Sequence, residues 1–172
     1  MPTIMTHAIV PLAAAALAGR GAIPPKVALA GAVLAMMPDA DVIGFRFGIE
    51  YADAWGHRGA THSLAIAGFV AAAIAAVWKQ ARNGPTFLFL FVATVSHGLL
   101  DMLTDGGLGV GLLWPASDER LFWPVTPVRV SPIGAGFFSM RGIETLVSEF
   151  LWIWLPAGVL AAIGMTERRR RA

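Results

Sequence analysis

The feature that most constrains this chain is a series of five apolar stretches that are almost free of charged residues. Of the 172 residues, 56% are hydrophobic and only 14% are charged, whereas soluble domains carry about 25% charged residues. A helix that crosses a bilayer needs about 20 apolar residues. The stretches approach this length and cover residues 6–18, 27–37, 63–78, 85–103 and 150–165. The sequence therefore predicts an all-α, polytopic integral membrane protein with about five transmembrane or membrane-embedded helices.

The stretches differ in length, and two long loops separate them. The first two are short and are expected to form a tilted or incompletely spanning hairpin, while the third and fourth are fuller spans. Pro156 is expected to kink the fifth. Residues 38–62 and 104–147 are predicted to be loops, and loops longer than about 15 residues are usually functional. We treat residues 1–172 as a single membrane-embedded domain.

Composition and charge exclude several classes of function. The chain has no cysteine, so it has no disulfide scaffold, no cysteine-ligated zinc and no thiol nucleophile. The net charge of +2 depends on Arg168, Arg169, Arg170 and Arg171, because without these four arginines it is 2 − 4 = −2. A basic tail of this kind suits anionic membrane lipids as partners. No second basic cluster supports a nucleic-acid groove, so no nucleic-acid partner is expected, and the sequence leaves the oligomeric state open.

The distribution of basic residues predicts how the chain is oriented. Lysine and arginine favour the cytoplasmic side of a bacterial membrane. The turn at 19–26 has two, the turn at 79–85 has two and the C-terminal tail has four. With five spans these three segments share one side. We therefore expect a cytoplasmic C-terminus and place both long loops outside the cytoplasm.

The side chains that carry chemistry all fall on the loop side of this topology. His97 and Asp101 are four residues apart, which leaves them only about 40° apart around a helix, so both can face one ion. Asp105 continues the same stripe and is a candidate general base, a role for which Asp39 is the other candidate. The full set of proposed metal ligands is His7, Asp39, Asp41, His57, His62, His97 and Asp101.

Mixed imidazole and carboxylate ligation indicates a divalent transition metal, with zinc first and manganese or iron as alternatives. Seven ligands exceed the needs of one tetrahedral zinc, so the site is expected to hold one or two ions. Arg58, beside His57, is a third catalytic candidate that would hold a substrate anion and steady developing negative charge. Glu144 and Glu149 are expected nearby but are left outside the ligand set.

Three motifs together carry a resemblance to a known family. They are Met37-Pro38-Asp39-Ala40-Asp41, then His57-Arg58-Gly59-Ala60-Thr61-His62-Ser63, then Ser96-His97-Gly98-Leu99-Leu100-Asp101-Met102-Leu103-Thr104. Between His7 and Pro124 the chain resembles the YdjM-like family of LexA-regulated, inner-membrane-associated metal-dependent hydrolases. The resemblance implies a multi-pass protein of the bacterial inner membrane. The His-x-x-x-Asp element is also similar to one in zinc-dependent phospholipases C, which suggests phosphoester hydrolysis.

The resulting hypothesis is a membrane-bound, metal-dependent hydrolase that acts on a phosphoester or lipid-linked substrate. Two alternatives use the same residues. One is a transporter that carries a metal or protons, and the other is a non-catalytic membrane protein stabilised by a metal. A transporter needs polar residues along a complete path, whereas the predicted cytoplasmic halves of the spans are almost purely apolar.

Overall fold

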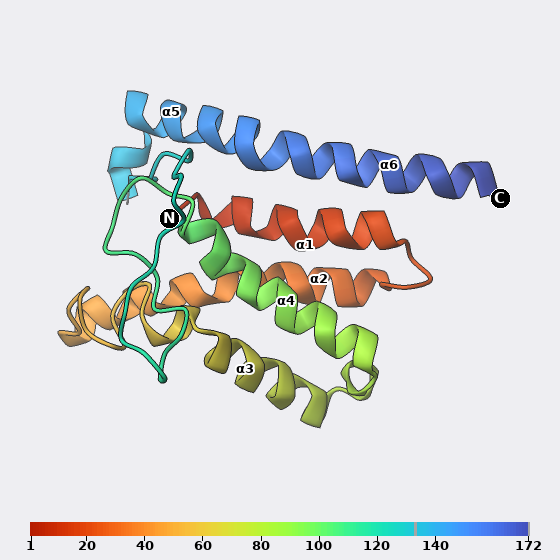
Figure 1. Cartoon of the computed structure of the whole chain (residues 1–172), viewed down its shortest axis with the longest axis horizontal. Coiled ribbons are helices and arrows are strands. Elements are labelled where there is room, and N and C mark those ends of the chain that lie inside the picture. Colours follow the sequence, from red (N-terminus) through yellow and green to blue (C-terminus); the bar gives the residue numbers. More distant parts are fainter. Residues whose placement is uncertain (133, 172) are drawn as a thin grey trace.

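A computed structural model describes residues 1–132 and 134–171 of the chain, which form a bundle of helices (Figure 1). Its main helices are α1 (Ile4–Ala18), α2 (Pro25–Met36), α3 (Leu64–Val77), α4 (Gly84–Asp101), α5 (Met140–Glu149) and α6 (Leu155–Arg171). The π-helical turn η5 (Phe150–Trp154) joins α5 to α6. Within the described residues only two isolated β-bridges occur and there is no strand. The predicted all-α class is therefore confirmed.

Short helices of the 3-10 type occupy parts of the connections. They are η1 (Met37–Phe47), η2 (Ala60–His62), η3 (Lys79–Arg82) and η4 (Gly134–Phe137). Because η1 continues directly from α2, the expected loop at 38–62 begins with helical backbone. The second long loop is also shorter than predicted, because α5 starts at Met140 rather than after Val147. Pro156 lies in the first turn of α6, directly after the π-helical turn.

Local sequence signals explain where several helices begin. The Ser63 side chain accepts a hydrogen bond from the backbone N–H of Ile66 at 3.1 Å and so caps α3. Asn83 caps α4 by accepting from Thr86 at 3.0 Å. Pro25 stands in the first turn of α2, where its missing N–H costs no helical hydrogen bond. These caps fix where the helices that carry the site start.

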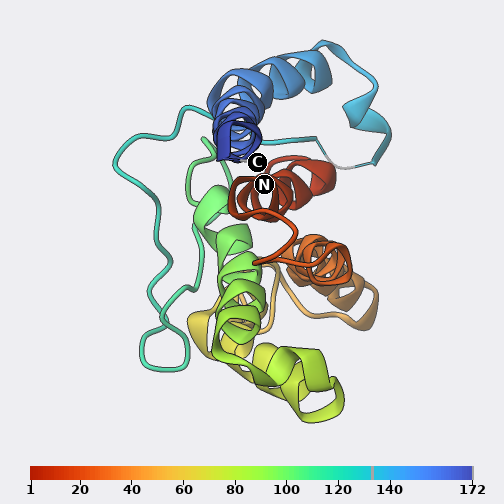
Figure 2. The same cartoon turned by 90° about the vertical axis from the view of Figure 1, so that its right-hand side faces the viewer.

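Helices α1, α2, α5 and α6 lie roughly along one axis, whereas α3 and α4 are inclined to it (Figure 1). Small residues bring neighbouring helices close together. Helix α1 packs between α2 and α6, and α4 packs against α2 and α3 (Figures 1 and 2). A Cβ on Gly31 of α2 would lie 2.6 Å from the Phe89 ring of α4, and one on Gly164 of α6 would lie 2.6 Å from the backbone of Leu17. Small residues at such contacts are typical of helix packing in membranes.

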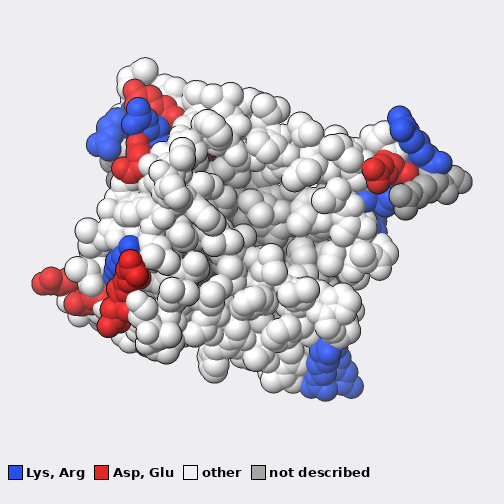
Figure 3. Space-filling model, viewed as in Figure 1, with Lys and Arg blue, Asp and Glu red and all other residues white. Residues whose placement is uncertain are grey.

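Charged side chains gather at the two ends of the bundle and leave an apolar band between them (Figure 3). Three helices are long and apolar enough to cross a membrane: Pro25–Phe47, Gly84–Asp101 and Met140–Arg170. The helices Ile4–Ala18 and Leu64–Val77 are apolar but shorter, at about 22 and 21 Å against a core of about 30 Å. The third stretch is therefore a helix close to its predicted bounds, but at this length it is not the full span that was expected.

The connections divide cleanly between the two ends. The turn between α1 and α2, the turn between α3 and α4 and the C-terminus lie at one end, and both long loops lie at the other (Figure 1). The three basic segments therefore lie at the same end of the bundle, as predicted. The arginine-rich tail belongs to the last turns of α6, where Arg168 donates to the backbone carbonyls of Leu17 and Ala16 at the end of α1.

Candidate metal centre

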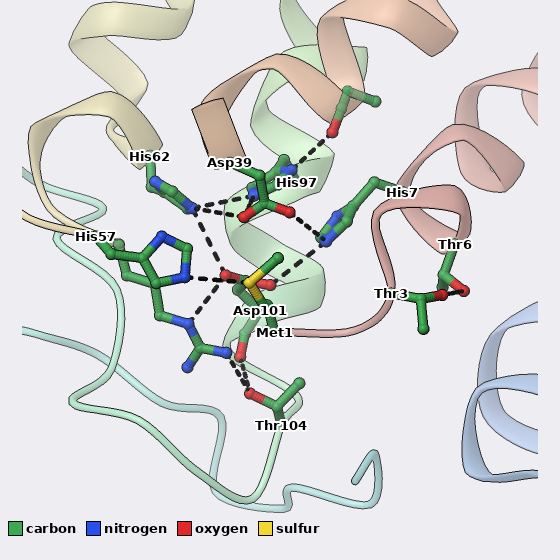
Figure 4. Close-up of polar contacts among 12 residues, drawn as sticks. Met1, Thr3, Thr6, His7, Asp39, His57, His62, His97, Asp101 and Thr104 are labelled. Atoms are coloured by element: carbon green, nitrogen blue, oxygen red, sulfur yellow. Dashed lines mark hydrogen bonds and ion pairs between the residues drawn. The ribbon is translucent and has the colours of Figure 1, made fainter. Parts of the chain in front are cut away.

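Four side chains from three parts of the chain converge at the loop-bearing end of the bundle. His97 and Asp101 come from the last turns of α4, Asp39 from η1 and His62 from the end of η2. One ligand atom from each lies within 4.8 Å of the others, and all four residues are buried. The i, i+4 spacing therefore does aim His97 and Asp101 at one point, as predicted (Figure 4). We call these four residues the inner cluster.

The spacing of the inner cluster fits a small metal ion. His97 Nε2 lies 3.0 Å from His62 Nε2 and 3.3 Å from Asp39 Oδ1. His62 Nε2 lies 3.6 Å from Asp101 Oδ2 and 3.9 Å from Asp39 Oδ1. Zinc bonds of about 2.0–2.1 Å place neighbouring ligands of a tetrahedron about 3.3 Å apart. The donor atoms are thus separated by about the distance that one zinc ion would impose.

Hydrogen bonding separates the outward-facing from the inward-facing atoms of this cluster. His97 Nδ1 donates to the backbone carbonyl of Ala35 at 2.7 Å, which orients the ring so that Nε2 faces the other residues of the cluster. The carboxylate oxygens of Asp39 and of Asp101 are buried and make no hydrogen bond, and the Arg58 guanidinium lies 3.0 Å from Asp101 Oδ2. Buried polar atoms are nearly always paired. An ion at the centre would bind both carboxylates together.

His7 lies at the edge of the inner cluster. Its Nε2 is 3.5 Å from Asp101 Oδ1 and 3.9 Å from Asp39 Oδ2, and its ring stacks on His97 with centroids 3.7 Å apart. The residue is fully buried, and neither of its ring nitrogens has a hydrogen-bond partner. It therefore faces the carboxylate oxygens that point away from His62, which suits a ligand to the same ion or to a second one.

Asp41 and His57 form a second group, which shares His62 with the inner cluster. Asp41 Oδ1 lies 2.6 Å from His57 Nδ1, and Asp41 Oδ2 lies 3.3 Å from His62 Nδ1. Thr61 donates its hydroxyl proton to the same Oδ2 at 2.7 Å. His57 Nε2 is turned toward the Met1 sulfur at 3.1 Å. The seven predicted ligands are therefore all close together, but they form two groups, which are joined through the two ring nitrogens of His62.

The charges around His62 change its protonation. Burial alone would lower the pKa of His62, but its contacts with the Asp101 and Asp41 carboxylates raise it to about 9. Asp41 thus fixes the orientation of His62, in the way that a carboxylate commonly supports a metal-ligating histidine.

Comparison with known proteins places the chain in a family. Residues 1–170 match the model of a family described as YdjM inner membrane protein. The chain belongs to this family. It is 45% identical over 175 residues to the inner membrane protein YbcI of Escherichia coli (strain K12), an alignment that covers 99% of this chain and 100% of YbcI. No solved structure matches the chain. The chain is therefore an inner membrane protein of the YdjM family, and its helices fit a multi-pass topology.

Arg58 reaches the inner cluster from the loop before η2. It is 1% exposed, and its Nε lies 3.0 Å from Asp101 Oδ2. Its remaining guanidinium nitrogens donate to the Gly106 carbonyl at 2.7 Å and to the Thr104 hydroxyl at 2.8 Å. The Arg58 backbone has φ = 66°, a left-handed conformation that non-glycine residues rarely adopt. Such strain persists only where surrounding contacts enforce it, and here it turns the guanidinium inward.

Asp105 does not join the cluster, in contrast to the sequence-based expectation. Its carboxylate accepts hydrogen bonds from Arg129 at 2.7 Å and from the Val130 backbone at 2.8 Å. Burial raises the pKa of Asp105, but the hydrogen bonds from Val130 and Arg129 and the Arg129 charge together lower it below its ordinary value. The helical stripe that connected Asp105 to Asp101 ends because α4 ends at Asp101. Of the two carboxylates predicted as general-base candidates, only Asp39 therefore lies in the inner cluster.

Glu149 is buried close to the cluster, but it anchors the start of α1 instead of facing the inner cluster. Its Oε2 accepts from the Thr3 hydroxyl at 2.7 Å and from the Thr6 hydroxyl at 2.6 Å. Its Oε1 accepts from the Thr3 backbone at 2.5 Å. Trp154 donates to the Thr6 hydroxyl at 2.8 Å, so the π-helical turn joins this network. The residue preceding His7 is thereby fixed, whereas Glu144 is exposed.

Proposed function

We propose that this protein is a membrane-bound, metal-dependent hydrolase of a phosphoester or lipid-linked substrate. The single observation that carries the proposal is the pair of buried carboxylates, Asp39 and Asp101, whose oxygens make no hydrogen bond and lie beside histidine nitrogens at metal-ligand spacing. Two buried carboxylates face one arginine, Arg58, which contacts Asp101 alone, and burying a charge that is not fully balanced costs several kcal/mol. A divalent cation bound there, with zinc first and manganese or iron as alternatives, would balance them.

The residues of the cluster would have different roles in hydrolysis. Asp39, His62, His97 and Asp101 would hold the ion, and His7 would complete this shell or hold a second ion. The ion supplies Lewis acidity and lowers the pKa of water near it. Asp39, the one ligand that also lines an open groove, is the proposed base that takes a proton from the attacking water.

Arg58 would contribute positive charge where the substrate gains negative charge. Its guanidinium lies against Asp101 and is held by Thr104 and Gly106, so little reorganisation accompanies its action. Water adds to phosphorus, the ester P–O bond breaks, and the leaving alcohol takes up the proton that the water lost. The site lies at the end of the helices that carries the long loops, which suits a substrate at the membrane surface. We propose that this end faces away from the cytoplasm.

The first test is the metal content of the protein purified in detergent, measured by elemental analysis. We expect zinc, manganese or iron in stoichiometric amount in the wild type and none in the His97→Ala, Asp101→Ala double variant. The matched control is Asp105→Asn, which removes a carboxylate outside the cluster and should keep its metal. A wild-type protein that binds no metal after reconstitution contradicts the proposal.

Activity is then measured with a panel of phosphomonoesters and phosphodiesters in the presence of the metal that was found. Hydrolysis by the wild type and by Asp105→Asn, but not by Asp101→Ala, supports the hydrolase. Bound metal without hydrolysis of any ester would favour the metal-stabilised alternative. Metal-dependent uptake into proteoliposomes would favour the transporter. Against transport stands the apolar cluster of Ala15, Ile23, Val27, Leu34, Ala81 and Leu90, which is buried inside the bundle.

A further inference from the structure

An apolar groove runs up to the candidate metal centre and has Asp39 in its wall. The groove has a volume of about 340 Å³, and its walls include Ile4 and Met5 of α1, Val42 of η1, Pro132 and Phe137. Asp39 is 4% exposed, and both of its carboxylate oxygens lack a hydrogen-bond partner. The groove thus places an apolar channel next to an unpartnered acidic ligand of the inner cluster.

The rim of the groove is apolar and exposed. Ile4 is 49% exposed, Met5 is 59% exposed, and the neighbouring Phe138 is 89% exposed. Such side chains at the surface of a membrane protein are expected to meet lipid rather than water. Helix α5, which follows, also exposes Ile143 and Val147. The groove therefore opens toward the region where lipid tails meet the loop-bearing end.

We infer that this groove binds the hydrocarbon tail of a single-chain lipid phosphate, with its phosphoester placed at Asp39. The inference rests on the proposed function and adds a substrate class to it. An apolar ligand channel with one polar group at its end fixes both the identity and the orientation of an amphiphile. The volume is near the lower limit of about 300 Å³ for ligand pockets, which suits one chain rather than two.

The inner cluster explains why the headgroup must be anionic. Once Asp39 and Asp101 share an ion with His62 and His97, the Arg58 guanidinium, 3.0 Å from Asp101, adds a positive charge beside them. A cation and an arginine attract phosphate. A lipid alcohol with the same tail would gain the apolar contacts but not this attraction, so the groove should discriminate between the two headgroups.

The test is photocrosslinking in phosphatidylcholine nanodiscs with the zinc-loaded protein. The probe is dodecyl phosphate with a diazirine at the end of its chain, and dodecanol with the same diazirine is the comparison. Labelled residues are mapped by mass spectrometry. We expect the phosphate probe to label the peptides that contain Met5, Val42 and Phe137 at least tenfold more than the peptide that contains Leu88, a lipid-exposed residue of α4. Excess unlabelled dodecyl phosphate should compete for this labelling.

Two variants keep the test decisive. Met5→Trp fills the groove and should remove the preferential labelling, whereas Leu88→Trp adds the same ring on another exposed surface and should not. Zinc content is measured for both, so that damage to the inner cluster is detected. Even labelling over all lipid-facing positions, or labelling that Met5→Trp leaves unchanged, overturns the groove.

Hydrolysis is scored separately in the same preparation. Preferential labelling without hydrolysis of any phosphoester supports the groove and overturns the hydrolase. Hydrolysis that is equally efficient for methyl and dodecyl phosphate, together with even labelling, overturns the groove and leaves the hydrolase standing.

Discussion

The two ends of helix α4 show how one helix serves two environments. Near its start, Leu90 is fully buried in the apolar cluster. Near its end, His97 and Asp101 are equally buried, but they face donor atoms from three other segments. Burying charged groups is costly unless they are paired or bind a metal. This difference shows that the buried charged side chains of α4 lie at one end, where a metal can balance their charge. Apolar packing stabilises the other end.

The largest expected effect comes from removing Asp101. Asp101→Ala deletes two ligand oxygens and the partner of Arg58, so we expect the bound metal to be lost and phosphoester hydrolysis to fall at least about 1,000-fold. Elemental analysis and turnover measure the two effects, and insertion is checked by membrane fractionation. Asp105→Asn, which changes a carboxylate paired with Arg129, should behave as the wild type. Stoichiometric metal in Asp101→Ala would break the contrast between the two ends.

A smaller effect is expected at Asp41, which orients His62 and His57. Asp41→Asn keeps the shape of the side chain but removes the charge that fixes the imidazoles. Loss of such a supporting carboxylate typically weakens metal binding about 10- to 100-fold. Competition with a fluorescent chelator measures the dissociation constant. A variant that lost its metal entirely would show instead that Asp41 is itself a ligand, and that the Asp41–His57–His62 group holds an ion of its own.

The sequence predicted most of the fold because hydropathy is a local property. The uncharged runs correspond to α1, α2, α3, α4 and α6. It missed α5 because that helix is amphipathic, with Glu144 and Ser148 interrupting an apolar face, and so it did not appear as an uncharged run. The π-helical turn after Glu149 was also not predicted, and its Trp154 donates a hydrogen bond to Thr6 at the other end of the chain, a contact that no single stretch contains.

The sequence predicted the arrangement of the site only for residues that lie on one regular helix, because there the helical period gives the direction of each side chain. His97 and Asp101 lie on one regular helix, and their spacing correctly brought them together. Asp105 was misplaced because the helix ends at Asp101. Asp39 and Asp41 appeared equivalent in sequence, yet they lie on 3-10 backbone, in which residues two apart are rotated by about 120° and face different partners. The Thr3–Thr6–Glu149 network joins the two ends of the chain, and local patterns do not show such a contact.

An effect of moderate size is expected from pH. In the metal-free protein the pKa of His62 is raised to about 9, so at neutral pH this imidazole is protonated and a metal must displace its proton. Apparent metal affinity should therefore rise about tenfold per pH unit toward pH 9 and level off above it. Titrations with zinc at several pH values, corrected for zinc hydroxide formation, measure this slope. An affinity independent of pH between 6 and 8 would show that His62 is neutral before metal binds.

The smallest effect on the metal centre is expected at the apolar end. Leu90→Ala leaves a cavity in the apolar cluster, which contains no residue of the inner cluster. In a bilayer the transfer contribution is small, because lipid replaces the protein contacts, so the cavity contribution dominates and the loss of stability should be about 1–3 kcal/mol. Unfolding in mixed micelles measures this loss, with and without zinc. Because Leu90 contributes to packing and the metal binds at the other end of α4, zinc should stabilise Leu90→Ala by the same increment as the wild type. The metal stoichiometry of the variant should be unchanged. A reduced zinc increment would mean that packing at the apolar end sets the positions of His97 and Asp101, and that the two halves of the helix are one cooperative unit.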